Sequence, residues 1–114
     1  MSPDRLSSTF AALADPTRRA ILARLAAGEA TVNELVAPFA LSQPTISKHL
    51  RVLEEAELIS RRVEGRRHVF TIVPSRMRQA QAWLKRHLDF WEGSFDQLDT
   101  LLEDLQQPKK GKRR

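Results

Sequence analysis

The sequence contains no cysteine among its 114 residues. Disulfide bonds, thiolate metal sites and thiol-based redox sensing are therefore excluded. No apolar run approaches the roughly 20 residues that span a membrane, and the opening stretch MSPDRLSSTF lacks the apolar core of a signal peptide. We therefore expect a cytoplasmic protein with no membrane partner.

The short motifs that accompany common catalytic sites are also missing. The sequence has no phosphate-binding glycine loop, no G-x-S-x-G or H-E-x-x-H pattern and no EF-hand loop. Its three histidines, at positions 49, 68 and 87, lie far apart along the chain. We predict that the protein is not an enzyme, that it has no catalytic residues and that it needs no cofactor.

Positive charge is concentrated rather than uniform along the chain. The formal net charge is +5 at pH 7, and five basic residues lie within positions 109–114, so the rest of the chain is balanced overall. Within that balanced part, basic side chains are concentrated in residues 42–73, although acidic ones accompany them. The basic ones are Lys48, Arg51, Arg61, Arg62, Arg66 and Arg67, and the acidic ones are Glu54, Glu55, Glu57 and Glu64. Such a concentration favours an anionic partner.

Residues 31–55 have the pattern of two short helices joined by a turn. Thr31 and Glu34 match a capping box at the start of the first helix, and Pro38 ends that helix. Ser42 is a suitable N-cap for the second helix. The apolar stripe of the second helix, at i, i+4 and i+7 spacing, consists of Ile46, Leu50 and Leu53. Because its opposite face is polar and positively charged, the pattern predicts a helix-turn-helix, although it also fits an αα-hairpin in a bundle.

A change of period from 3.6 to 2 follows this segment. Residues 58–63 and 67–73 alternate as strands do, and they flank a turn centred on Gly65. Directly after a helix-turn-helix, such a hairpin is typical of the wing of a winged helix, with Arg66 and Arg67 at its tip. The alternative is that these arginines only protect a solvated edge strand.

Two helices are expected before this segment. Ser2 as N-cap and Pro3 predict the start of the first, which should end near Ala14. Asp15 and Pro16 predict the start of the second, which Gly28 should stop. The expected inward-facing residues are Leu6, Phe10 and Leu13 in the first helix and Ile21, Leu22 and Leu25 in the second.

A long final helix is predicted from Ser75 as its cap to about Gln106. Its apolar residues follow a heptad, interrupted at Gln81, and they are Met77, Leu84, Leu88, Trp91, Phe95, Leu98, Leu102 and Leu105. A small domain cannot cover so long a stripe alone, so we expect it to pack partly against a second copy. The alternative is packing within one monomer.

Two motifs resemble a known family. Residues 13–22, LADPTRRAIL, are similar to the opening signature of the ArsR/SmtB (arsenical-resistance) repressors, and residues 42–50, SQPTISKHL, closely match the recognition helix of that family. The resemblance extends to about Leu105. It departs from the family at Glu57, where a glycine usually occupies a left-handed turn, so this helix either carries roughly 1 kcal/mol of strain or ends differently.

The resemblance implies a mainly α-helical fold with a small β-hairpin. This is a winged helix-turn-helix domain over residues 1–106 that forms a homodimer through its first and last helices. Residues 107–114 would be a basic disordered tail that serves solubility or non-specific attraction to phosphate. The final helix, with Trp83, Phe90 and Trp91, looks most like the metal-independent SdpR-like branch of the family.

The sequence lacks the metal-ligand patterns that other members of this family carry. Some members carry a cysteine-containing metal box on the first helix of the helix-turn-helix, where residues 32–36 of this chain offer no soft ligand. Others place a site on the final helix across the dimer. His87, Asp89 and Glu92 lack the paired spacing of such a site and are expected on a solvated helix face. We therefore predict no metal ligands.

A surface for DNA is expected on the recognition helix and the wing. The start of a helix offers free N–H groups to phosphate, and the Gln43 amide is able to pair with adenine. The candidate DNA-binding residues are Ser42, Gln43, Thr45, Ser47, Lys48, His49, Arg51, Arg66 and Arg67. His49 has the alternative of packing inside the domain. The candidate dimer-interface residues are Leu6, Phe10, Leu84, Leu88, Trp91, Phe95, Leu98 and Leu102.

These observations predict a sequence-specific DNA-binding transcriptional regulator. The preferred form is a dimeric repressor that binds an inverted repeat in double-stranded DNA without sensing metal. Two alternatives stay open. One is a metal- or small-ligand-responsive repressor of the same fold, with an apolar ligand held among Trp83, Phe90, Trp91 and Phe95. The other is a winged-helix module for protein interaction.

Overall fold

The computed structural model of the protein describes residues 4–106, except for the side chain of Phe95. The predictions for Ser2 and Pro3, for the Phe95 side chain and for the tail at 107–114 lie outside the described residues. The chain divides into two compact units, Met1–Ala80 and Gln81–Arg114, and each is described by itself.

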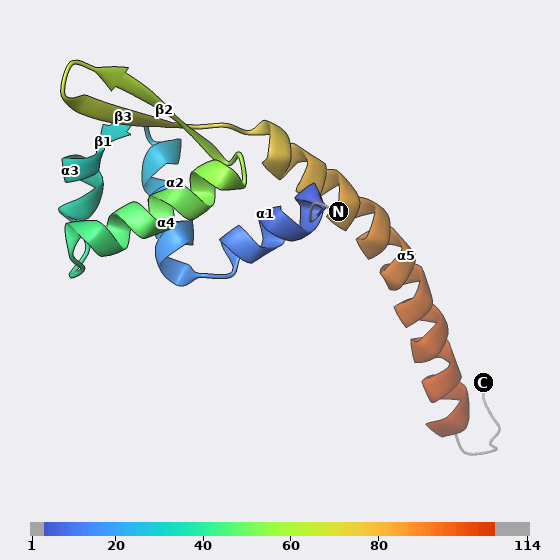
Figure 1. Ribbon diagram of the computed structural model, residues 1–114. Helices are drawn as coiled ribbons and strands as arrows, with labels where there is room; N and C mark the ends of the chain where they lie inside the picture. The colour runs from blue at the N-terminus through green and yellow to red at the C-terminus, as the bar shows by residue number, and fades with distance from the viewer. Residues whose placement is uncertain (1–3, 107–114) are drawn as a thin grey trace. The chain divides into compact units, whose positions relative to one another are not determined.

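Five helices and three short strands make up the described chain (Figure 1). In chain order they are α1 (Arg5–Leu13), α2 (Pro16–Ala26), β1 (Ala30–Thr31), α3 (Val32–Val36), α4 (Gln43–Glu55), β2 (Ile59–Glu64), β3 (Arg67–Ile72) and α5 (Ser75–Gln106). Helices α3 and α4 form the predicted helix-turn-helix, and β2 with β3 forms the predicted hairpin. The mainly helical, winged helix-turn-helix fold is therefore confirmed.

Capping side chains define where most of the helices begin. Asp15 and Ser42 cap α2 and α4 as predicted, each accepting a hydrogen bond from the backbone N–H three residues on. The N-cap of α1 is Asp4, whose carboxylate accepts the Ser7 N–H at 2.8 Å, so this helix begins at Arg5, later than predicted. Ser75 is the first residue of α5 rather than its cap.

The sheet has the strand order β1-β3-β2, with both neighbouring pairs antiparallel. The hairpin pairs Ile59 with Ile72 at its base and Glu64 with Arg67 at its tip, around Gly65 at a φ of 61°. The third strand, β1, was not predicted. It pairs Ala30 with Phe70, so the chain segment that leads into α3 is hydrogen-bonded to the wing.

One core joins the helices of the first unit to the sheet. It contains the predicted inward-facing residues of α2 and α4 together with Leu35, Leu58 and Phe70. In α1 the buried positions are Thr9 and Ala12, whereas Leu6, Phe10 and Leu13 are only half-buried. Burial of Thr9 leaves no polar group unpaired, because its hydroxyl donates to the Arg5 carbonyl at 2.9 Å.

Helix α4 ends in a Schellman motif built around a non-glycine residue. The N–H of Leu58 donates to the Leu53 carbonyl at 3.0 Å, and the N–H of Glu57 donates to the Glu54 carbonyl at 2.9 Å. This motif needs a left-handed residue, and Glu57 supplies it with a φ of 60°. The chain therefore keeps the left-handed turn and accepts the strain, because Leu53 and Leu58 are both fully buried by it.

The described part of the second unit is one helix, the continuation of α5. Its side chains leave a long apolar stripe exposed, which consists of Leu84, Leu88, Trp91, Leu98, Leu102 and Leu105. Two further apolar residues, Phe90 and Leu101, are also exposed. The described helices include none with the length and apolar character needed to cross a bilayer.

Candidate nucleic-acid interface

The side chain of Ser42 caps the first turn of α4. The Ser42 hydroxyl oxygen accepts the Thr45 N–H at 3.3 Å and lies 2.9 Å from the Thr45 hydroxyl. These two hydroxyls therefore already bond to each other, while the neighbouring Gln43 side chain is exposed. Of the polar groups in this turn, the Gln43 amide is the one best placed to read a partner.

The exposed face of α4 is polar, because its core stripe is buried on the opposite side. Ile46, Leu50 and Leu53 are at most 2% exposed. Ser47, Lys48 and Arg51, in contrast, are exposed, one to two helical turns beyond Gln43. Helix α4 thus presents an amide, a hydroxyl and two cations along one surface.

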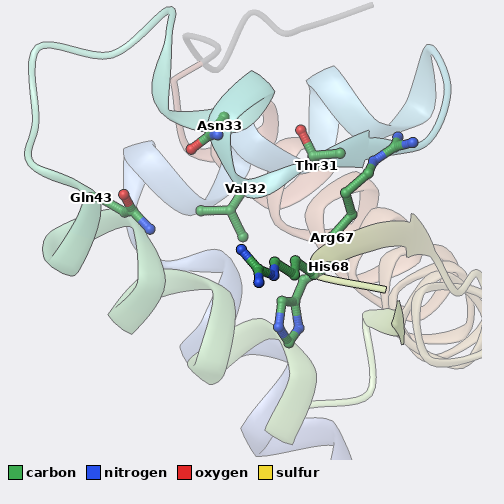
Figure 2. Close-up of a pocket in the computed structure, with 7 residues that line it drawn as sticks. Thr31, Val32, Asn33, Gln43, Arg67 and His68 are labelled. Atoms are coloured by element: carbon green, nitrogen blue, oxygen red, sulfur yellow. The ribbon is translucent and has the colours of Figure 1, made fainter. Parts of the chain in front are cut away.

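A hollow of about 420 Å³ lies between α4 and the wing tip (Figure 2). Figure 2 shows Gln43 of α4 on one side of it and Arg67 and His68 of β3 on the other. Residues of α3 and the strand before it form its floor, and the complete lining is Thr31, Val32, Asn33, Gln43, Arg66, Arg67 and His68. The structure therefore brings together the predicted start of the recognition helix and the predicted wing tip.

A second, smaller hollow of about 120 Å³ continues along the same side of α4. Its lining includes Ser47 and Arg51 of α4 and Arg61 of β2. Arg61 is paired with Glu54 at 3.3 Å, and its guanidinium lies 5.9 Å from the centre of the Phe70 ring. Polar side chains thus line the hollows beside α4 from its first turn to its last, next to the apolar Val32, Leu50 and Phe70.

The arginines of the wing differ in how far their charge is neutralised. Arg62 binds Glu29 at 2.9 Å and Glu64 at 2.6 Å, which raises the pKa of its guanidinium and holds the pKa of Glu29 below its usual value. Within residues 4–106, no ion pair involves Lys48, Arg51 or Arg66. These cations, together with Arg67, which also forms no ion pair within those residues, are available to an anionic partner.

The charge of Arg67 is less neutralised than that of Arg62 but lies near two carboxylates. Hydrogen bonds from Arg62 and from Thr31 are the main causes that lower the pKa of Glu29 and of Glu34, respectively, and the charge of Arg67 adds a smaller contribution to both. Arg67 is exposed and lines the hollow beside Gln43. Its charge is therefore partly offset by the carboxylates of Glu29, just before β1, and Glu34, in the first turn of α3.

His49 lies apart from the exposed face of α4. Its side chain is 19% exposed, and Nδ1 is 3.3 Å from Arg18 Nη1 and 3.8 Å from Asp15 Oδ2. The ring thus contacts the start of α2 instead of the groove beside the wing. On its Nδ1 side the ring therefore packs inside the domain, which is the alternative that the sequence left open for His49.

Four residues that line the larger hollow were not predicted from the sequence, namely Thr31, Val32, Asn33 and His68. Asn33 is exposed, whereas His68 is half-buried and its Nδ1 atom is buried without a hydrogen-bond partner. Their proximity to Gln43 follows from the pairing of β1 with β3. A strand of two residues gives no periodic signal from which this could have been found.

The candidate dimer residues fall into two groups. Leu6 and Phe10 of α1 are half-buried in the first unit. Leu84, Leu88, Trp91, Leu98 and Leu102 of α5 are between 43% and 51% exposed. About half of each of these α5 side chains is therefore exposed, which is the state expected of a surface that packs against another chain.

No group of three potential metal-ligating side chains comes together in the described part of the chain. His87 Nδ1 instead lies 2.9 Å from the Trp83 carbonyl oxygen, and the two rings stack with their centres 4.0 Å apart. A carbonyl oxygen only accepts hydrogen bonds, so this nitrogen carries the proton in that contact. Lys85 pairs with Asp89 at 3.5 Å across one helical turn.

Comparison with known proteins places these features among regulators of transcription. Residues 13–62 match a family described as a helix-turn-helix domain. The chain is 44% identical over 91 residues to the HTH-type transcriptional regulator Rv2034 of Mycobacterium tuberculosis, covering 79% of this chain and 78% of that protein. It is 33% identical over 79 residues to the transcriptional repressor SdpR of Bacillus subtilis, covering 69% and 88%.

A solved structure supports the same assignment. The crystal structure of an ArsR family transcriptional regulator superimposes with a TM-score of 0.74 at 40% sequence identity. The match covers 81% of this chain and 95% of the other.

Proposed function

Because this chain belongs to the ArsR family of helix-turn-helix transcriptional regulators, we propose that it is a dimeric repressor that binds an inverted repeat in double-stranded DNA and senses no metal. The membership itself makes it a DNA-binding regulator of transcription and not an enzyme. The dimer, the operator symmetry, the metal independence and the individual contacts are the proposal.

The observation that carries the proposal is the hollow between α4 and the wing. In B-DNA one sugar-phosphate strand separates the major groove from the adjacent minor groove. A helix in the major groove and a wing tip in the minor groove must therefore straddle that strand. The hollow lies between Gln43 on the helix and Arg66 and Arg67 on the wing, which is where such a strand would pass.

This docking divides the side chains by role. Gln43 and Ser47, on the exposed face of α4, would contact base edges, with Thr45 and Ser42 supporting the first turn. Lys48 and Arg51 would bind phosphate or guanine, and Arg66 with Arg67 would follow the minor groove. Asn33 and His68, which line the hollow, would add contacts to the strand between the two grooves.

A dimer follows from the exposed stripe of α5. Large apolar side chains at heptad spacing on a helix of 32 residues are best covered by a second copy of the same helix. Two recognition helices related by a two-fold axis read the same sequence on opposite strands, which makes the operator an inverted repeat.

Metal independence is supported by the donor chemistry. The chain has no cysteine, and the segment Val32–Val36 offers only Asn33 and Glu34 as polar side chains. Glu34 is already engaged in the capping box, where its carboxylate accepts the Thr31 N–H at 2.8 Å. These features support the prediction that the chain belongs to a metal-independent, SdpR-like branch of the family.

Selection of bound DNA from a random pool tests the function directly. We expect enrichment of a palindrome whose half-sites are centred about one helical turn, or a multiple of it, apart. Enrichment of no sequence would reject the repressor role and favour a protein-interaction module. A single half-site would reject the symmetric dimer.

Metal and ligand dependence are tested on the selected operator. Binding should be unchanged by Zn²⁺, by arsenite and by a chelator, and the melting temperature of the free protein should not move in a screen of metals and metabolites. Release of the DNA by a metal would reject metal independence. Release by an organic compound would favour the ligand-responsive alternative.

A further inference from the structure

Arg18 joins three helices of the first unit through its guanidinium. Its Nε donates to the Ala12 carbonyl at 2.7 Å and its Nη2 donates to the Ala11 carbonyl at 3.1 Å. Both carbonyls belong to the last turn of α1, where intrahelical donors run out. The remaining nitrogen, Nη1, lies 3.3 Å from Nδ1 of His49 on the recognition helix.

The chemistry of this last contact fixes the proton on the His49 ring. A guanidinium has donors and no acceptor, so Nδ1 of His49 must accept from Arg18. Asp15 Oδ2 is 3.8 Å from the same nitrogen, which is too far for a hydrogen bond, and it already accepts the Arg18 N–H at 3.0 Å. The neutral ring therefore carries its hydrogen on Nε2.

That second nitrogen remains open to solvent. Among the described side chains that are not exposed, Nδ1 of His68 is the one nitrogen or oxygen that is buried and has no hydrogen-bond partner. Nε2 of His49 is therefore not buried. His49 Nε2 also has no hydrogen-bond partner within residues 4–106, so it has access to water. A fixed N–H donor thus stands on the recognition helix without a partner in the free protein.

The position of His49 on α4 indicates which part of the DNA its Nε2–H would contact. The base-reading face of α4 carries Gln43 and Ser47, whereas His49 lies on the flank that packs against the start of α2. Side chains outside the base-reading face of a recognition helix contact the sugar-phosphate backbone, so a donor on this flank meets phosphate and not a base edge.

We propose that Arg18 is a positioning residue for DNA binding, which holds the His49 ring with its proton on Nε2 so that the recognition helix presents this N–H to a backbone phosphate. The inference rests on the proposed function and assigns a role to a residue of the 13–22 motif that is not among the candidate DNA-binding residues. Arg18 itself does not touch DNA.

The imidazole nitrogen shifts of the free protein test the tautomer without DNA. In ¹⁵N NMR spectra at pH 8, the wild-type His49 signals should be those of a single Nε2–H form. Signals of an Nδ1–H form would overturn the assignment, whether or not the protein binds its operator.

A matched pair of substitutions tests the phosphate contact. His49→Gln places an N–H donor near the position of Nε2, whereas His49→Asn places its polar atoms near Nδ1 and leaves the Nε2 position empty. On the selected operator, His49→Asn should weaken binding about tenfold, the effect of losing one hydrogen bond to a charged group, and His49→Gln should restore most of it. Equal affinities for the two variants would overturn the contact.

A double-mutant cycle tests whether Arg18 acts through His49. Arg18→Met should weaken binding about fivefold to tenfold when His49 is present and have little further effect in a His49→Ala background. A purely structural role would give the same loss in both backgrounds and would reject the inference. All affinities are measured below the unfolding transition of the least stable variant, which circular dichroism defines.

Different results would reject DNA binding by the protein and the role of Arg18. If wild-type protein binds no DNA with sequence preference, the proposed function falls, while the tautomer result still stands on the free protein. If wild-type protein binds its operator but the cycle is additive, only the role of Arg18 falls.

Discussion

The Glu57 carboxylate forms an ion pair with the Arg76 guanidinium in the first turn of α5. The backbone of Glu57 at the same time holds a φ of 60°, in the left-handed region that favours glycine. One residue therefore combines a backbone cost at the end of the recognition helix with a side-chain contact to the start of the last helix.

The two effects at Glu57 are separable by substitution. Glu57→Ala keeps the left-handed strain and loses the ion pair, whereas Glu57→Gly loses both. We expect the glycine variant to be about 1–2 kcal/mol more stable to urea than the alanine variant, because only the strain differs between them. Equal stabilities would mean that the turn rearranges when the side chain is removed.

Removal of Arg66 should weaken binding to all DNA sequences. Arg66 is exposed at the wing tip without an ion pair in the described chain, so its charge is free to displace a counterion. For Arg66→Ala we expect the slope of log K against log salt to fall by about 1 in magnitude. Lys85→Ala removes the same charge from an ion pair on α5 and should leave the slope unchanged. A similar slope change in both variants would show a purely non-local charge effect.

Gln43 and Lys48 should differ in what they contribute to binding. Gln43→Ala removes an amide that faces the hollow, so we expect a loss of about 1–3 kcal/mol on the selected operator and almost none on random DNA. Lys48→Ala removes an unpaired cation and should weaken both to the same extent. Competition binding against the two DNAs measures the difference, and indistinguishable variants would contradict these assignments.

A charge in the exposed stripe of α5 should separate the proposed dimer. Leu88 is 51% exposed in the described chain, and burial of a glutamate against a second apolar helix is costly. Leu88→Glu should sediment as the 13.0 kDa monomer at micromolar concentration, while Arg86→Gln, with the same change in net charge on the opposite side of the helix, should not. A wild-type protein that is itself monomeric would reject the dimer.

Acid should destabilise the protein partly through the capping box of α3. The Thr31 N–H and hydroxyl donate to Glu34 and hold the pKa of its carboxyl below its usual value of 4.5. The stabilisation is therefore complete above that pH and is lost as the pH falls through the lower folded-state pKa. We expect Glu34→Gln to have a lower melting temperature than wild type at pH 7 and a smaller difference at pH 3. A constant difference would exclude this linkage.

Much of the first unit was predictable because its signals are local. Asp15, Ser42 and the Thr31 capping box each determine a helix start within a few residues, and Gly65 between two alternating segments defines the hairpin. Of the two endings that the sequence left open for α4, the structure has the left-handed one at Glu57.

The remaining features depend on contacts between distant residues. The pairing of Arg62 with Glu29, at a separation of 33 residues, decides which wing arginines are neutralised. The contact of Arg18 with His49 decides which side of the recognition helix the imidazole occupies. Neither relationship has a periodic or capping signal, because each arises only after the helices and the sheet have packed together.

The pairing of β1 with β3 has a mechanical consequence for how the protein would adapt to a duplex. Val69 and Phe70 are hydrogen-bonded on one side to β2 and on the other to the strand that leads directly into α3. A rotation of the whole hairpin would have to break those bonds or carry α3 with it. Adjustment to DNA grooves of different width is therefore confined to residues 63–68, beyond this junction. The reach of the wing-tip arginines would then vary, while the angle between the hairpin and the recognition helix stays constant.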